Sequence, residues 1–171
     1  MLNKRVEKAL NDQIAKEAYA SNSYLAMASW CEGKGLRGCT AFFYGQSDEE
    51  RQHMLKLIKY VNDSAGEAVI DAITQPKSDY KSIKDIFETS LKQERAVTAS
   101  INNLVELAFT TKDHATYNFL QWYVSEQHEE ESLFKTILDI INLGEEDKQS
   151  LLLVDIEIGK IRAAEIQSEK D

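Results

Sequence analysis

Proline and glycine are scarce along this chain. Pro76 is the single proline in 171 residues, and the sequence contains seven glycines. Because proline breaks helices and glycine weakens them, the regions on either side of Pro76 contain few points at which a helix must end. Alternating segments of β-branched residues, which would indicate strands, are also scarce. We therefore expect an all-α fold with four long helices and one shorter helix.

The composition, with 43% hydrophobic and 29% charged residues, is typical of a globular protein with a packed core. The net charge of −9 argues against nucleic-acid or anionic-membrane partners, because these require a basic patch or tail. Residues 1–19 contain no apolar core of signal-peptide length, and no segment approaches the roughly 18 apolar residues of a membrane span. We expect a cytoplasmic protein that attracts cations.

Apolar residues recur at helical spacing over four long segments. These segments are residues 6–30, 37–62, 82–110 and 113–143. Asp113 is placed to cap the fourth helix, and Gly144 to end it. We expect one domain spanning 1–171, in which residues 5–143 form a four-helix bundle.

Two further segments complete the expected architecture. Residues 63–81 contain Pro76 and lack a helical stripe, so they form a long connection that lets the second and third helices run parallel. Residues 145–166 predict a fifth helix that packs against another element, and residues 167–171 a frayed tail. One side of this fifth helix would carry Leu151, Val154, Ile158 and Ile161.

Each long apolar stripe is interrupted near its middle by polar residues. They are Glu17 in the first, Glu50 and His53 in the second, Glu94 in the third, and Gln127 and Glu130 in the fourth. Residues three apart share a helix face, so all four sets can converge in the core. They could instead be surface charges, but this alternative requires the inward face of all four helices to be wrongly assigned.

Several buried carboxylates repel one another and cannot offset their own cost of burial, whereas bound cations can. Oxygen-rich ligands with one imidazole suit iron or manganese better than structural zinc. One established arrangement in ferritin-like bundles uses two single glutamates and two Glu-x-x-His pairs. This chain has one such pair, at residues 50–53, and Gln127-His128-Glu129-Glu130 in place of the other.

With these features the sequence resembles prokaryotic non-haem ferritins over nearly its whole length. The segments YGQSDEERQHM and NFLQWYVSEQHEEE, the helix lengths, the long connection and the fifth helix carry the resemblance. It implies a hollow homo-oligomeric shell of 24 subunits, without haem, that oxidises Fe(II) with O2 or peroxide. The Fe(III) would be stored inside as a hydrated oxide mineral.

The resemblance also implies roles for the buried residues. Glu17, Glu50 and His53 would bind one iron. Glu50, Glu94 and Glu130 would bind the second, with Glu50 bridging the two irons. Gln127 would lie beside the second iron, where bacterioferritins resemble this chain but have a histidine. The amide would weaken that position, which fits iron that passes on to the mineral.

Prokaryotic ferritins also have a third iron site close to the first two. Its expected ligands are present here as Glu49, Glu126, Glu129 and Glu130. The alternative is that these carboxylates form a solvated acidic surface.

The resemblance gives two aromatic residues candidate roles in electron transfer. Tyr24 matches the redox-active tyrosine of the family, and Trp122 is placed to donate an electron. Both could equally be packing residues of the core.

Four other residues that often carry chemistry are expected to have no role. Cys31 and Cys39 stand eight residues apart without a second thiol pair, so we expect free thiols and no cysteine-based metal site. His114 and His128 lack partners at ligand spacing and are expected at the surface.

Three other functional classes stay open at this point. A rubrerythrin-like peroxidase would need a cysteine-rich iron module, and an oxygenase a second Glu-x-x-His pair. A bacterioferritin would bind haem through a methionine, for which Met54 is available, and a miniferritin would place its iron ligands between subunits. A helical interaction protein would use its acidic face without any metal.

Overall fold

The computed structural model of the chain describes residues 2–144 and 148–168. The helices are α1 (Lys4–Gly33), α2 (Arg37–Asp63), α3 (Ile83–Thr110), α4 (His114–Leu143) and α5 (Lys148–Ser168). No strand occurs among these residues, so the expected all-α fold is confirmed. Residues 167 and 168 belong to α5, and the expected frayed tail is wrong there. The rest of that tail, and the expected start of the fifth helix at residues 145–147, lie outside the described residues.

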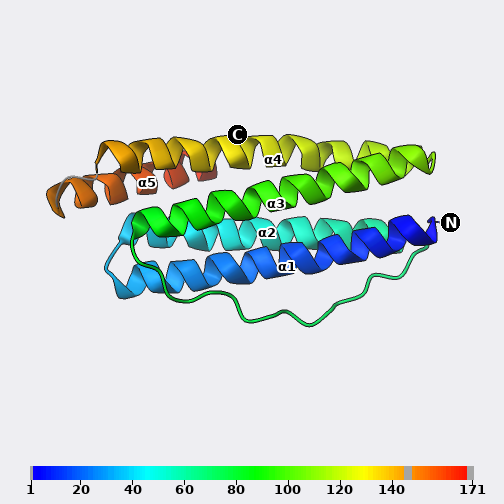
Figure 1. The fold of residues 1–171 in the computed structure, drawn as a ribbon, viewed down its shortest axis with the longest axis horizontal. Coiled ribbons are helices and arrows are strands. Elements are labelled where there is room, and N and C mark those ends of the chain that lie inside the picture. The colour runs from blue at the N-terminus through cyan, green and yellow to red at the C-terminus, as the bar shows by residue number, and fades with distance from the viewer. Residues whose placement is uncertain (1, 145–147, 169–171) are drawn as a thin grey trace.

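The long connection has the expected course. Figure 1 shows α2 and α3 running in the same direction, while the chain between them returns along the outside of the bundle past α1. The helices α1 and α2 pack together as one antiparallel pair, and α3 and α4 as another. No helix among the described residues is long and apolar enough to cross a membrane.

Polar side chains cap three of the long helices at their first turn. The side-chain oxygens of Asn3, Ser82 and Asp113 accept hydrogen bonds from backbone N–H groups at the starts of α1, α3 and α4. The Asp113 bond, to the N–H of Thr116 at 3.1 Å, confirms the predicted cap. Leu36, at the start of α2, cannot supply such a bond from its own side chain.

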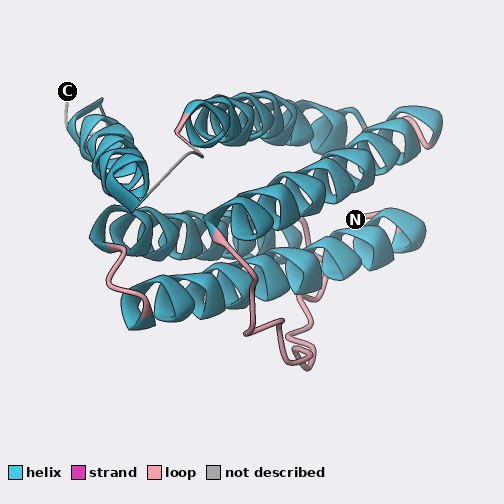
Figure 2. Cartoon of the chain, turned by 60° about the vertical axis from the view of Figure 1, so that its left-hand side comes forward, coloured by secondary structure: helices cyan, strands magenta, loops and turns pink. Residues whose placement is uncertain are grey.

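The cap of α2 comes from α5. The buried Asp155 carboxylate accepts hydrogen bonds from the N–H groups of Gly38 at 3.0 Å and Cys39 at 2.8 Å. A Cβ on Gly38 would lie 1.8 Å from the backbone oxygen of Asp155, so only glycine permits this approach. The fifth helix is therefore fastened to α2, at an angle to the long helices that Figure 2 shows.

Three of the four residues expected on the inward side of the fifth helix pack against the core. Val154 and Ile158 are buried and Ile161 packs against the same core, but Leu151 is exposed. Leu151 lies one turn before Asp155 on the same face of α5, but it borders an open pocket near the start of the helix and is 37% exposed. Gly144 ends α4 as expected, but with a φ of −103° rather than a left-handed one. A Cβ there would meet the Val154 side chain at 2.4 Å, so close packing explains this glycine.

The apolar core is divided into two clusters. One lies toward the α1–α2 turn and includes Met27, Phe42, Phe87 and Phe134, while the other includes Leu10, Leu57, Ile101 and Leu120. In the sequence of every long helix, the interrupting polar residues fall between the two clusters. Glu17, Glu50, His53, Glu94, Gln127 and Glu130 are all buried there. The alternative that they are surface charges is therefore wrong.

Candidate metal centre

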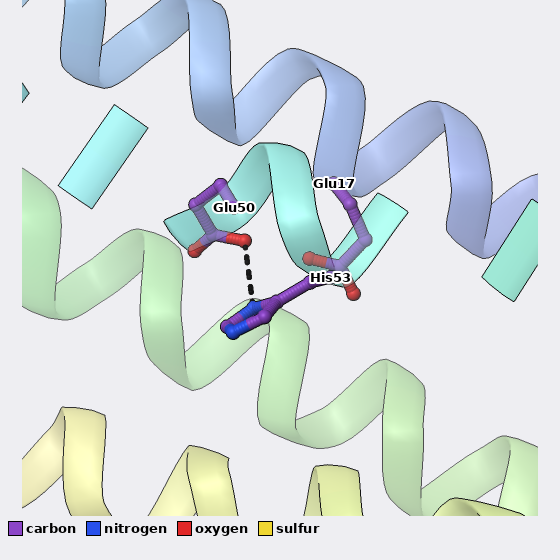
Figure 3. A group of neighbouring side chains, drawn as sticks. All are labelled: Glu17, Glu50 and His53. Atoms are coloured by element: carbon purple, nitrogen blue, oxygen red, sulfur yellow. Dashed lines mark ion pairs between the residues drawn. The ribbon is translucent and has the colours of Figure 1, made fainter. Parts of the chain in front are cut away.

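Three of the predicted ligands meet in the polar layer. Glu17 from α1 and Glu50 and His53 from α2 each offer a ligand atom, and these atoms all lie within 4.8 Å of one another. Figure 3 shows the three side chains pointing together, with His53 Nδ1 at 3.3 Å from Glu50 Oε2. Their exposed fractions are 1%, 2% and 5%, so water contributes little to stabilising their charges.

Two carboxylate oxygens in this cluster have unmet hydrogen-bonding capacity. Glu17 Oε1 accepts a hydrogen bond from Gln13 Nε2 at 2.8 Å, but Glu17 Oε2 has no hydrogen-bond partner. Glu50 Oε2 also lacks one, despite its proximity to the His53 ring. Buried oxygens without partners are costly in a folded protein. A divalent cation would satisfy both, and two carboxylates with an imidazole are a suitable ligand set for iron.

The surroundings make it costly for these carboxyl groups to be charged without a cation. Burial raises the pKa of Glu50 well above its ordinary value, and the negative charges of Glu17 and Glu94 add to that rise. Burial lowers the pKa of His53, but the bond to Glu126 and the charge of Glu17 outweigh it, so this pKa is raised. The centre therefore holds more protons than the same groups would in water.

Glu94 is already satisfied on both oxygens. Tyr24 donates its hydroxyl hydrogen to Oε1, and Gln127 Nε2 donates to Oε2 at 3.1 Å. Burial nevertheless raises the pKa of Glu94, although the two hydrogen bonds lower it. Burial, followed by the charge of Glu94, raises the pKa of the Tyr24 hydroxyl well above its ordinary value, so this hydroxyl stays a donor. Gln127 thus contacts the centre through a hydrogen bond.

Glu130 lies in the same layer. It is buried, and its negative charge contributes to the raised pKa values of Glu50 and Tyr24. Among the described residues, Glu94 and Glu130 lie in the same buried layer as Glu50 but outside the group of ligand atoms that could hold a metal.

The residues expected at a third site are not gathered in the same way. Glu126 is 3.7 Å from His53 Nε2, with 29% of its side chain exposed. Glu49 forms an ion pair with Arg162, and Glu129 is exposed. Among the described residues, no group of three possible metal ligands includes any of these glutamates.

Two aromatic residues border the centre. Tyr24 is fully buried and stacks on Phe43 and Phe134. Trp122 lies edge-on to His53, with 5.2 Å between ring centroids, and the Lys56 ammonium lies 3.3 Å from the Trp122 ring centroid. Both residues pack as core residues and also contact residues of the centre.

The two other histidines and the two cysteines lie as expected. His114 and His128 are exposed. Cys31 and Cys39 are buried free thiols, and the neighbouring Cys31 thiol together with burial raises the pKa of Cys39.

Three contributors to the centre and its edge were missed in the sequence. Gln13 bonds Glu17 at the i, i+4 spacing, which a search for polar partners on the same helix could have found. Asp155 and Arg162 act across helices, and only their spacing of seven residues, two helical turns, hints at a shared face.

Comparison with known proteins agrees with this geometry. The family model of the ferritin-like domain matches residues 7–143. A bacterial non-heme ferritin of Campylobacter jejuni is 48% identical over 155 residues, covering 91% of this chain and 93% of that protein. This chain belongs to the ferritin family. A probable bacterial non-heme ferritin-like protein of Haemophilus influenzae is 47% identical over 161 residues, covering 94% and 98% of the two chains.

Solved ferritin structures have the same fold. An open-pore ferritin of the archaeon Archaeoglobus fulgidus superposes with a TM-score of 0.91 at 39% identity, covering 93% of this chain and 98% of its own. The expected ferritin-like bundle and the resemblance to prokaryotic non-haem ferritins are thereby confirmed. Membership of the family supports a role in iron storage.

Proposed function

We propose that this protein is an iron-storage ferritin with ferroxidase activity at an intrasubunit di-iron centre. The observation that carries the proposal is the buried cluster of Glu17, Glu50 and His53, with two carboxylate oxygens lacking hydrogen-bond partners. Fe(II) is the substrate. Each of two Fe(II) ions gives up one electron, so together they reduce O2 to peroxide, or peroxide to water, and the Fe(III) passes to the mineral.

The two iron positions differ in the hydrogen bonds that their ligand oxygens make before iron binds. Glu17, Glu50 and His53 would bind the first iron through Glu17 Oε2 and Glu50 Oε2, which have no hydrogen bond to break. At the second position, Glu94 must release or share its bonds from Tyr24 and Gln127. We therefore propose that the first position fills before the second, and that the second holds iron more weakly.

Tyr24 is proposed to donate one of the two further electrons that reduce the peroxide to water, with Trp122 or a later Fe(II) ion donating the other. Its hydroxyl already donates a hydrogen bond to Glu94, so this carboxylate can take the proton when the ring gives up an electron. Trp122, in contact with His53, is a second candidate for electron donation. Glu49, Glu126 and Glu129, with Glu130, are proposed as the candidate ligands of a third position.

The shell of 24 subunits, the absence of haem and the cytoplasmic location are further parts of the proposal, supported by membership of the family. Light scattering of the purified protein measures the size of the shell. A visible absorbance scan detects haem and separates this function from that of a bacterioferritin.

Anaerobic Fe(II) titration followed by addition of O2 tests the ferroxidase activity. In the double variant Glu50→Ala with His53→Ala, the initial rate of increase in ferric absorbance should fall by more than about tenfold. Loss of a residue that only contacts a metal ligand typically lowers metal affinity or activity by about 10–100-fold, and these two residues are the proposed ligands themselves. His128→Ala, which changes an exposed histidine, is the matched control and should oxidise iron at the wild-type rate. Equal initial rates in the double variant and the wild type would disprove the di-iron assignment.

A further inference from the structure

The carboxylate of Glu49 is bound by a cation of the protein itself. Arg162 Nη1, on α5, donates a charge-assisted hydrogen bond to Glu49 Oε1. Gln46 Nε2 donates to Glu49 Oε2 at 2.9 Å. Only 12% of the Arg162 side chain is exposed, so this is a partly buried ion pair rather than a solvated one.

The position of the guanidinium is built into the packing of α5 on α2. A Cβ on Gly45 would lie 2.1 Å from Arg162 Nε and 2.5 Å from Arg162 Nη2, so the guanidinium lies directly on the glycine backbone. Two turns earlier on α5, Asp155 caps the start of α2. A well-packed helix, and not a flexible side chain reaching in from solvent, therefore places this positive charge.

Glu49 directly precedes Glu50 on α2, and the proposed third iron position depends on its carboxylate. A guanidinium and a divalent cation cannot bind the same carboxylate oxygen at once. Both are positively charged, so they also repel each other when both lie beside Glu49.

We propose that Arg162 takes the place of a divalent cation at Glu49 and thereby sets how many iron ions each subunit binds before oxidation. This inference rests on the proposed function, because it presupposes that the first two positions bind Fe(II). Arg162 is a specificity-determining residue of the centre: with its guanidinium in place, the third position stays closed. The placement of α5 then controls the binding capacity of a site carried by the four-helix bundle.

Anaerobic calorimetric titration of the assembled protein with Fe(II) tests the inference. We expect two ions per subunit in the wild type and a third in Arg162→Gln, with affinity at that position raised by about tenfold or more. Arg162→Lys keeps the charge and should resemble the wild type. Lys160→Gln removes an exposed positive charge from the same helix and is the matched control.

A second variant tests the same idea without removing the charge. Gly45→Ala fills the space on which the guanidinium lies, so it should displace Arg162 from Glu49 and also open the third position. This variant decides the matter if Arg162→Gln fails to fold.

Two ions per subunit in a folded Arg162→Gln or Gly45→Ala variant, or three in the wild type, would refute the role of Arg162 and leave the ferroxidase proposal intact. Failure of the wild type to bind any Fe(II) would instead refute the proposed function itself.

Discussion

Glu50 shows how a single residue can be unfavourable for the fold and useful for the chemistry. It is buried beside Glu17 and Glu94, and one of its oxygens lacks a hydrogen-bond partner. An isolated buried carboxylate lowers stability, and a bound cation reverses the effect. The stability that the metal-free protein loses by burying this carboxylate is therefore regained when a cation binds.

This view predicts a pH dependence of stability in the metal-free protein. Glu50 holds its proton more tightly when folded, because burial raises its pKa above the ordinary value of 4.5. Folding therefore takes up a proton between that value and the raised pKa, and the free energy of unfolding should fall as the pH rises through this window. Chemical denaturation at several pH values measures the slope.

Glu50→Gln replaces the carboxyl group by an amide that does not ionise, so this variant should show a shallower slope. Glu88→Gln, a change of the same kind at an exposed position on α3, should keep the wild-type slope. A slope unchanged in Glu50→Gln would show that this residue is not the origin of the pH dependence.

Among the elements, α5 makes hydrogen bonds to the start of α2 that α2 does not make with its own side chains. Its Asp155 is the cap of α2, the helix that also carries Glu50 and His53. The start of α2 lacks a side-chain cap of its own, so the two elements depend on each other.

Asp155→Ala should lower the free energy of unfolding by about 1–2 kcal/mol, the typical effect of losing a helix cap. Chemical denaturation measures this change, and hydrogen exchange should be faster at the amides of Gly38 and Cys39. Glu157→Ala, on the exposed side of the same helix, should have little effect. Normal protection of both amides in Asp155→Ala would contradict the capping role.

The helices could be predicted from the sequence because each long one has apolar residues at helical spacing and residues that start or end a helix. Asp113 as a cap, the connection around Pro76 and the buried glutamates all follow from patterns within one segment. The bonds between helices could not be predicted, since they depend on how one helix is rotated against another. For this reason Asp155 was missed, and Leu151 was expected to be covered although it is exposed.

At the scale of the whole molecule, the polar layer separates two apolar clusters that would otherwise form one core. The four long helices meet at this layer through carboxylates that repel one another. Packing at both ends holds the helices together, and a cation in the middle would join them directly.

Metal binding should therefore stabilise the entire bundle. Co(II), which stays divalent in air, should raise the midpoint of thermal unfolding; at a free concentration 100 times the dissociation constant the gain is about 2.7 kcal/mol. Glu17→Gln with Glu50→Gln should abolish the shift, and His128→Ala should retain it. A shift of equal size in the double variant would show that Co(II) binds elsewhere.

The ion pair between Arg162 and Glu49 has a practical consequence for protein engineering. The start of α5 is a natural place to redesign the surface, because Leu152, Leu153 and Ile156 lie exposed there. Any change that moves α5 also moves the guanidinium that contacts Glu49, the residue before Glu50 on α2. Under the proposed function, redesign of that helix therefore alters iron loading as well.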